Sequence, residues 1–264
     1  MLLAVMILGV VQGLTEFLPV SSSGHLVLFQ ELLTPPGDPL VFDLAVHLGT
    51  LIPVIVVFWD DLWGLVDFKG NKGSSDAVAT QGWRPIALIV LGSIPTAFIG
   101  FTFKDQFEAL FHNAGTLIIT FAITGTLLFL TKFAKQGATT LMEMPWVTAL
   151  IIGTVQGLAI TPGISRSGST IAIALFLGLS RDVAAKFSFL LSIPAIGGAM
   201  LLMAKDVNWA EANIPMLLAG ALTAAASGYL ALKLLLKLVN SGDFSRFAWY
   251  CWAMAGVAAF VYLQ

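Results

Sequence analysis

Three ionisable residues lie inside long apolar stretches of the sequence, where a membrane would surround them. Glu16 and His25 occur within residues 2–34, and Arg166 occurs within residues 146–178. A charge at that depth costs free energy unless it is paired or used, so such residues are functional candidates by default. A carboxylate can hold a cation, an imidazole can transfer a proton or attack as a nucleophile, and a guanidinium can bind an oxyanion.

The residues around these candidates are small and polar. Serine and threonine hydroxyls donate to oxyanions, and glycines let backbone N–H groups approach a ligand closely. A helix that begins near Arg166 would aim its N-terminal N–H groups at the same place, beside a guanidinium fork suited to phosphate. The sequence therefore predicts an anion site, with phosphate as the best ligand. The predicted substrate-binding residues are Gln12, Ser21, Ser23, Gly24, Gly163, Ser165, Ser167, Gly168 and Thr170.

Glu16 alone does not suit an anion site, because a carboxylate repels phosphate. A divalent cation between the two, Mg²⁺ or Ca²⁺, would remove the repulsion, since both ions accept carboxylate and phosphate oxygens. Gln12 precedes Glu16 by one helical turn, so its amide oxygen is a candidate second metal ligand. His25 is a candidate nucleophile, or a base for Ser22 or for a water molecule, and these alternatives remain open.

Both clusters interrupt apolar segments rather than follow them. Residues 2–34 are broken by a proline- and serine-rich stretch at 19–25, and residues 146–178 by a similar stretch at 161–170. Polar, non-helical backbone at membrane depth survives only where protein or water surrounds it. We therefore predict two re-entrant pairs, each a half-helix in, a polar tip and a half-helix back out.

The two predicted pairs are copies of one another. Residues 7–14 (ILGVVQGL) align with residues 151–158 (IIGTVQGL), and the serines and glycine of the first tip fall on those of the second. Three further spanning helices in each half would give an odd number of crossings, so the second half should be inverted. We predict one membrane domain, 1–264, made of inverted repeats at about 1–135 and 146–264. Ile160 takes the place of Glu16 in the second copy.

Composition places the whole chain in a membrane. It is 58% hydrophobic and 11% charged, whereas soluble domains are about 25% charged, and this difference excludes an ordinary soluble fold. Six more apolar stretches are each long enough to cross a hydrocarbon layer of ~30 Å. The predicted fold is an all-α polytopic membrane protein, with spanning helices at about 43–60, 85–103, 114–131, 187–204, 212–237 and 247–264.

Lys and Arg residues are distributed unequally between the two predicted faces. Apart from Arg166, only Lys104 and Lys205 fall on the face shared with the termini. The positive-inside tendency therefore predicts that both termini and the first tip lie outside the cytoplasm. The net charge of -2, without a basic stripe, argues against a nucleic-acid partner. The opposite face holds Lys69, Lys72, Arg84, Lys132, Lys135, Arg181, Lys186, Lys233, Lys237 and Arg246.

Other polar residues are predicted to have structural roles. His47 lies in a predicted spanning helix and His112 in a loop, and both are expected to be structural. The Asp60-Asp61 pair begins a predicted loop and should be solvated. Cys251 is the single cysteine, lies in an apolar stretch and is expected only to pack.

Both tips resemble the signatures of a known family. Residues 12–25 (QGLTEFLPVSSSGH) resemble the first signature of the bacterial undecaprenyl-diphosphate phosphatases, the bacitracin-resistance family, and residues 162–168 (PGISRSG) resemble the second. The similarity in length and hydropathy covers essentially the whole chain. The resemblance implies hydrolysis of undecaprenyl diphosphate to the monophosphate, which recycles the lipid carrier of cell-wall synthesis. It also implies a divalent cation and a site that faces the periplasm or the cell exterior.

The resemblance assigns roles by matching position. It implies that Glu16 is the essential acid, that His25 and Ser22 are nucleophile candidates, and that Arg166 clamps phosphate. Many family members have Glu where this chain has Gln12, so the local negative charge is reduced here. A transporter or flippase of an anionic lipid is the alternative, because inverted repeats are common among transporters. Expected partners are a lipid diphosphate, membrane lipids and, in a homodimer, a second copy of the chain.

Overall fold

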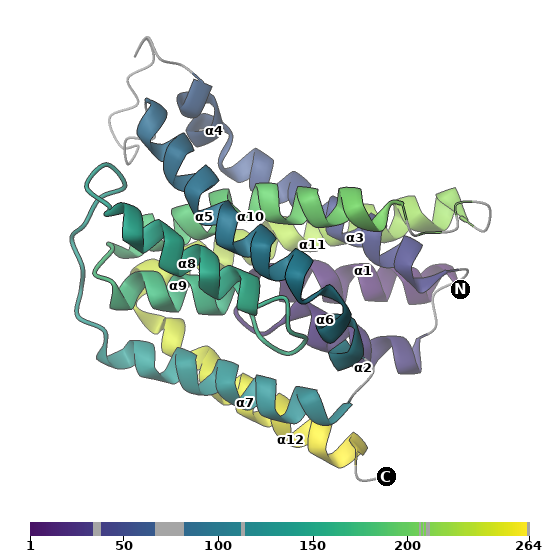
Figure 1. The fold of residues 1–264 in the computed structure, drawn as a ribbon. Helices are drawn as coiled ribbons and strands as arrows, with labels where there is room; N and C mark the ends of the chain where they lie inside the picture. Colours follow the sequence, from purple (N-terminus) through teal and green to yellow (C-terminus); the bar gives the residue numbers. More distant parts are fainter. Residues whose placement is uncertain are drawn as a thin grey trace.

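The computed structural model describes residues 1–33, 38–66, 82–111, 114–205, 207, 209 and 212–262. These residues form helices and no strand, which confirms the predicted all-α membrane fold (Figure 1). Lys69, Lys72 and His112 lie outside the described residues. Among the described residues, five helical spans are long and apolar enough to cross a membrane. Four are single helices: α3 (Pro39–Val57), α5 (Trp83–Thr102), α10 (Arg181–Met203) and α11 (Ile214–Ser241). The fifth, Gly115–Phe133, consists of α7 (Ala114–Leu130) and the short helix that follows it.

The predicted boundaries differ from the observed ones in several places. The last predicted span, 247–264, is α12 (Phe247–Tyr262), whose 16 described residues make it shorter than the other five. Helix α10 begins six residues earlier than predicted, because the Ser180 hydroxyl accepts the N–H of Val183 and caps it there. Four short helices occupy predicted loops: α4 (Trp59–Val66), α6 (Lys104–Phe111), η1 (Thr131–Phe133) and η3 (Asp243–Arg246).

Both predicted re-entrant pairs are a helix, a break and a second helix. In the first, α1 (Leu2–Phe17) ends where Leu18 becomes extended ahead of Pro19, and α2 (Ser22–Leu32) then begins. In the second, α8 (Trp146–Leu158) is followed by α9 (Arg166–Phe176). Neither pair is a continuous rod, and Figure 1 shows the two pairs extending from opposite ends of the molecule toward its middle.

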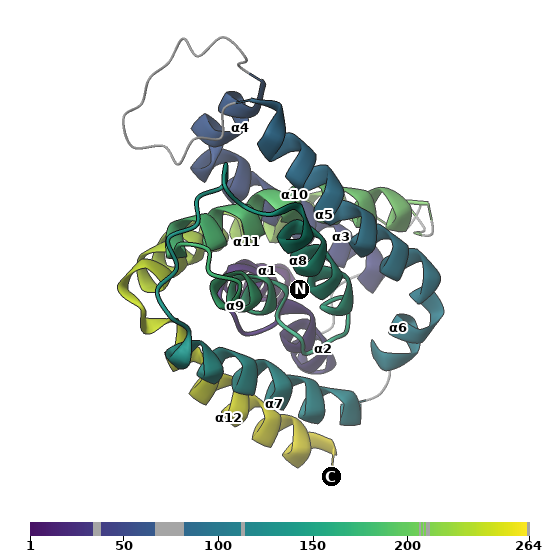
Figure 2. The same ribbon diagram turned by 60° about the vertical axis from the view of Figure 1, so that its left-hand side comes forward.

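In each half of the chain, the first helix packs against a helix of the other half. Helix α1 packs along α11, and α8 packs along α5. Glycine makes both contacts close: a β-carbon on Gly9 would lie 2.4 Å from the Gly220 carbonyl oxygen, and one on Gly153 would lie 1.9 Å from that of Gly92. Helices α7 and α12 form a further pair, which runs along one side of the two hairpins, below α9 and α2 in both ribbon views (Figures 1 and 2).

Asp61 is not solvated as predicted. Its carboxylate accepts from Lys186 Nζ at 2.8 Å, and the two side chains are only 14% and 10% exposed. Lys186 lies within α10 and would be a buried, uncompensated charge without this partner. The ion pair therefore joins α4 of the first half to α10 of the second, while Asp60 stays exposed.

Candidate active site

The two tips begin with the same capping arrangement. The Ser21 hydroxyl accepts the N–H of Gly24 at 3.4 Å, and the Ser165 hydroxyl accepts the N–H of Gly168 at 3.0 Å. These N-caps start α2 and α9, so both helices aim their free N-terminal N–H groups at the centre of the molecule. Such N-termini attract anions, as the sequence predicts for this region.

Glu16 and Arg166 meet at this centre, although they are 150 residues apart. Arg166 Nη2 donates to Glu16 Oε1 at 2.5 Å. The other carboxylate oxygen, Oε2, accepts from Ser22 Oγ at 2.6 Å and from Gln12 Nε2 at 3.1 Å. The Glu16 side chain is 8% exposed and that of Arg166 is 15% exposed, so water screens the pair little.

Two buried polar atoms at this centre have no hydrogen-bond partner among the described residues. They are the donor Nη1 of Arg166 and the acceptor Oε1 of Gln12. An unsatisfied buried group costs about 1–3 kcal/mol, so these two atoms beside an ion pair are groups that a bound ligand would satisfy. The donor suits a phosphate oxygen, and the acceptor suits a cation or a hydroxyl.

His25 lies in the first turn of α2 but faces away from the carboxylate. Its Nδ1 is 2.7 Å from the Ser21 carbonyl oxygen, and its Nε2 is 2.8 Å from the hydroxyl of Tyr250 on α12. Within the described part of the chain, no hydrogen bond joins His25 to Ser22 or to Glu16. The structure therefore brings Glu16, Ser22, Gln12 and Arg166 together and places His25 beside them with other partners.

The glycines of the tips allow the two hairpins to touch. Gly163 has φ of +85°, and a β-carbon on Gly24 would lie 3.1 Å from its Cα. A β-carbon on Gly168 would lie 3.1 Å from Cβ of Pro19. Because the N–H groups of Gly24 and Gly168 already donate to the capping serines, these two glycines serve the contact between tips.

The remaining predicted hydroxyls bond mainly within the protein. Ser21 contacts Ser23 and Ser165 contacts Ser167, each at 3.3 Å between hydroxyl oxygens. Ser167 also donates to the Leu18 carbonyl at 3.5 Å, which links the second tip to the first. Thr170 is fully buried and donates to the Arg166 carbonyl at 2.8 Å. These contacts hold the shape of the tips around the central ion pair.

The chain is similar in sequence to known proteins over almost its whole length. The sequence profile described as "Bacitracin resistance protein BacA" matches residues 5–257. The chain belongs to this family. It is 46% identical to a protein named undecaprenyl-diphosphatase from Halothermothrix orenii, with 94% of this chain and 93% of that protein covered. Proteins of the same name from Desulfatibacillum aliphaticivorans and Methanosphaera stadtmanae are 45% and 41% identical, with at least 94% of each chain covered.

Some residues near the site were not predicted from the sequence of this BacA-family chain. Tyr250, within the last predicted span, was not predicted to take part, yet its hydroxyl bonds His25. Asp43 near the start of α3 is half-buried and accepts from Gln30 Nε2 at 2.6 Å. One turn later, His47 Nδ1 donates to the Asp43 carbonyl oxygen at 2.7 Å. The sequence signal for this pair was Asp43, which lies at the start of the predicted span 43–60, one turn before His47.

The glutamine of the second tip has different hydrogen-bond partners from the glutamine of the first. Gln156, the counterpart of Gln12, donates to the Thr96 hydroxyl at 3.2 Å and to the Leu191 carbonyl at 3.4 Å. It is therefore bonded to α5 and α10. With Ile160 in place of a carboxylate, the second tip supplies the guanidinium alone.

The side chains at this site are too few to surround a metal ion, but two of them fit an ion that also binds the substrate phosphate. Among the described residues, no group of three or more His, Cys, Asp or Glu side chains is placed to hold a metal ion. Gln12 Oε1 is unpaired beside Glu16, and a carboxylate has about four lone-pair positions, of which three are used here. These two side chains fit a divalent ion that takes its other ligands from phosphate and water.

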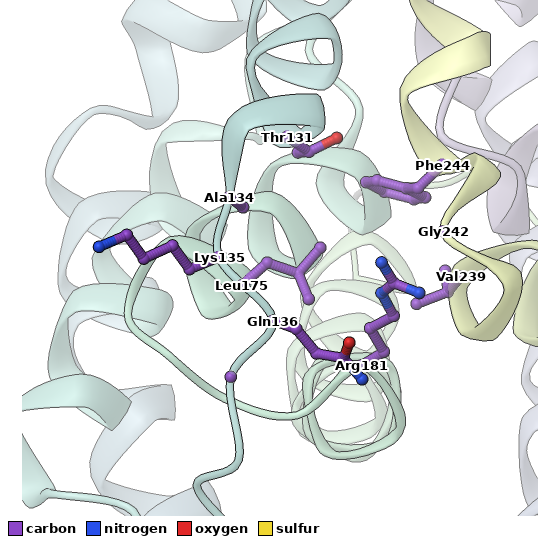
Figure 3. A pocket seen from close by; sticks show the side chains of 10 residues that line it. Thr131, Ala134, Lys135, Gln136, Leu175, Arg181, Val239, Gly242 and Phe244 are labelled. Atoms are coloured by element: carbon purple, nitrogen blue, oxygen red, sulfur yellow. The ribbon is translucent and has the colours of Figure 1, made fainter.

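A cavity elsewhere in the molecule is too small to hold a lipid diphosphate. It lies where η1 and the segment after it approach α9, α10 and the end of α11 (Figure 3). Its volume is about 30 Å³, enough for one or two water molecules. Arg181, which lines it, donates to the Asn240 carbonyl at 3.2 Å and so caps α11.

Proposed function

We propose that this chain is a membrane phosphatase that hydrolyses undecaprenyl diphosphate to undecaprenyl phosphate and inorganic phosphate. The observation that carries the proposal is the Glu16–Arg166 pair, formed between the two tips, with Arg166 Nη1 left without a partner. The relatives named undecaprenyl-diphosphatase cover almost the whole chain, which supports the same substrate. The lipid tail would lie between helices while the diphosphate enters the polar centre.

The substrate would be held by groups from both halves. Arg166 Nη1 and the N-terminal N–H groups of α2 and α9 would bind the terminal phosphate, and they would stabilise the charge that builds up in the transition state. Gln12 Oε1 and Glu16 would hold Mg²⁺ or Ca²⁺ together with phosphate oxygens. That ion, when bound, neutralises phosphate charge and polarises the phosphoryl group.

Ser22 is the nucleophile that the contacts favour. Its hydroxyl donates to Glu16 Oε2 at 2.6 Å, whereas both ring nitrogens of His25 have other partners. In the first step, Ser22 Oγ would bond the terminal phosphorus while its proton moves to Glu16. The bond to the bridging oxygen breaks, and undecaprenyl phosphate leaves with that electron pair. Glu16 would pass that proton to the departing phosphate and become a carboxylate again. Water would then attack the phosphoserine while Glu16 takes one of its protons, and Glu16 would give this proton to Ser22 Oγ as inorganic phosphate departs.

The same proposal includes the architecture and orientation of the chain. Residues 1–135 and 146–264 would form inverted repeats, which is supported by the matching caps and by the exchanged packing of α1 on α11 and α8 on α5. Both termini and the first hairpin would face outward from a bacterial cytoplasmic membrane, as the distribution of Lys and Arg supports.

Release of phosphate by the purified protein tests this function. In detergent there is no gradient, so hydrolysis of undecaprenyl diphosphate separates an enzyme from a transporter or flippase. We expect release that stops with chelator, and that falls at least about 100-fold in Arg166→Ala, since one lost transition-state donor costs 10²–10³ in rate. Arg246→Ala is the matched control, because Arg246 is an exposed arginine paired with Asp243. Wild-type release in Arg166→Ala would refute the assignment.

A further inference from the structure

Tyr250 on the last helix makes a specific contact with the first tip. Its hydroxyl lies 2.8 Å from His25 Nε2, and the two rings stack with centroids 5.6 Å apart and planes 12° apart. His25 is 2% exposed, whereas Tyr250 is 45% exposed, so the tyrosine covers the imidazole on the side of α12. The two residues are 225 positions apart, and nothing in local sequence requires them to meet.

The other ring nitrogen fixes which tautomer is present. A backbone carbonyl can only accept, so Nδ1, at 2.7 Å from the Ser21 carbonyl oxygen, carries a hydrogen. In the neutral ring, Nε2 is then the acceptor, and the Tyr250 hydroxyl must donate to it. With Nδ1–H donating to Ser21 and Nε2 accepting from Tyr250, both ring nitrogens of a neutral His25 have a hydrogen-bond partner.

Ser21 shows strain that this arrangement explains. It is the only non-glycine residue with positive φ in the described part of the chain, at +68°. Such backbone costs on the order of 1–3 kcal/mol and persists where surrounding contacts impose it. Here it aims the Ser21 carbonyl at His25, whose backbone N–H and Nδ1 both contact that oxygen.

A second contact from α12 reaches the other side of the same tip. Cys251 Sγ lies 3.5 Å from the Pro19 carbonyl oxygen and is fully buried. The edge of His25 meets the ring of Phe121 on α7, at 88° between planes. Helices α7 and α12 therefore hold the tip from Pro19 to His25, the segment that contains Ser22.

We propose that Tyr250 is a positioning residue for the reaction at Glu16 and Arg166. By donating to Nε2, it holds His25 as the Nδ1–H tautomer, and His25 in turn fixes the strained Ser21 carbonyl and the first turn of α2. That turn presents the Ser22 hydroxyl to Glu16. The proposal rests on the proposed phosphatase activity for its kinetic part, while its structural part stands on the contact alone.

Nitrogen-15 NMR of the detergent-solubilised protein tests the structural part without any substrate. The chain has three histidines, so ¹⁵N-histidine labelling gives three imidazoles, and His47→Gln and His112→Gln identify two of them. We expect His25 to show a protonated Nδ1 and an unprotonated, hydrogen-bonded Nε2. In Tyr250→Phe, which keeps the ring and loses the hydroxyl, the Nε2 signal should shift and the tautomers should mix. Tyr262→Phe, on the same helix and exposed, is the control.

Kinetics then test the link to the reaction. We expect Tyr250→Phe to lower kcat about tenfold, within the range for residues that orient a reacting group, with a smaller change in KM. Tyr250→Leu, which also loses the ring, should be no more active than Tyr250→Phe. A proton on Nε2 of His25 in the wild-type protein would overturn the proposal, and so would wild-type kcat in Tyr250→Phe. Absence of phosphate release from the wild-type protein would instead count against the proposed function.

Discussion

At the scale of single residues, the important choice is the partner of Ser22. Sequence spacing left Ser22, His25 and water open as nucleophiles, because residues three apart in a helix can share a face. In the structure, Ser22 donates to Glu16, while His25 is bonded to Ser21 and Tyr250. The carboxylate that the sequence marks as essential is therefore the base nearest to the serine hydroxyl.

Ser22→Ala should abolish turnover at this site. Because the bond-forming oxygen is removed, we expect kcat to fall on the order of 10³-fold or more. Ser23→Ala is the control, since Ser23 bonds only to Ser21 among its described neighbours, and we expect less than a tenfold effect. Quenching wild-type turnover should yield phosphoserine at position 22. Phosphohistidine at position 25, or full activity in Ser22→Ala, would contradict this assignment.

At the scale of helices, close glycine contacts set where the two tips lie. The sequence predicts the breaks well, because Pro19 and the Ser-Gly stretches end one helix and cap the next whatever surrounds them. The duplicated motif also predicts that each half carries such a tip, but it does not predict that Glu16 and Arg166 bond to each other. The Tyr250–His25 and Asp61–Lys186 contacts could not be predicted, because each depends on which helices become neighbours.

Gly153→Ala should weaken the packing of α8 on α5. A β-carbon there would lie 1.9 Å from the Gly92 carbonyl oxygen, so the helices must separate, at a cost of about 1–3 kcal/mol. We expect a lower thermal unfolding temperature in detergent and a matching loss of activity, since α8 carries the second tip. Gly197→Ala in α10, where nothing lies within 4 Å of the added carbon, is the control. Equal unfolding temperatures for the two variants would show that this contact is looser than described.

At the scale of the whole molecule, the two halves are joined by helices packed across the repeat boundary, by the Glu16–Arg166 pair at the tips and by a second buried ion pair. Asp61 and Lys186 link α4 to α10 at 2.8 Å, with little exposure of either side chain. Because the pair joins opposite halves, its loss should affect the molecule as a whole rather than one hairpin.

Breaking this pair on one side should be worse than removing it entirely. Lys186→Met leaves the Asp61 carboxylate buried and unpaired, which costs about 3–5 kcal/mol. Adding Asp61→Leu removes the stranded charge, so the double variant should recover most of the unfolding temperature lost in the single one. A double variant that is no more stable than Lys186→Met would indicate that Asp61 finds water or another partner in solution.

The central claim is that the two hairpins meet, so that one site is built from both halves. It can be tested by a disulfide between Cys replacements at Pro19 and Gly168, in a Cys251→Ala background that leaves no other thiol. A β-carbon at position 168 lies 3.1 Å from that of Pro19, near the ~3.8 Å of a disulfide, so small adjustments suffice. We predict rapid crosslinking under mild oxidation, seen as a linked peptide pair after digestion, and none between positions 19 and 197. Failure of positions 19 and 168 to link, in a protein that remains folded and active, would contradict the account.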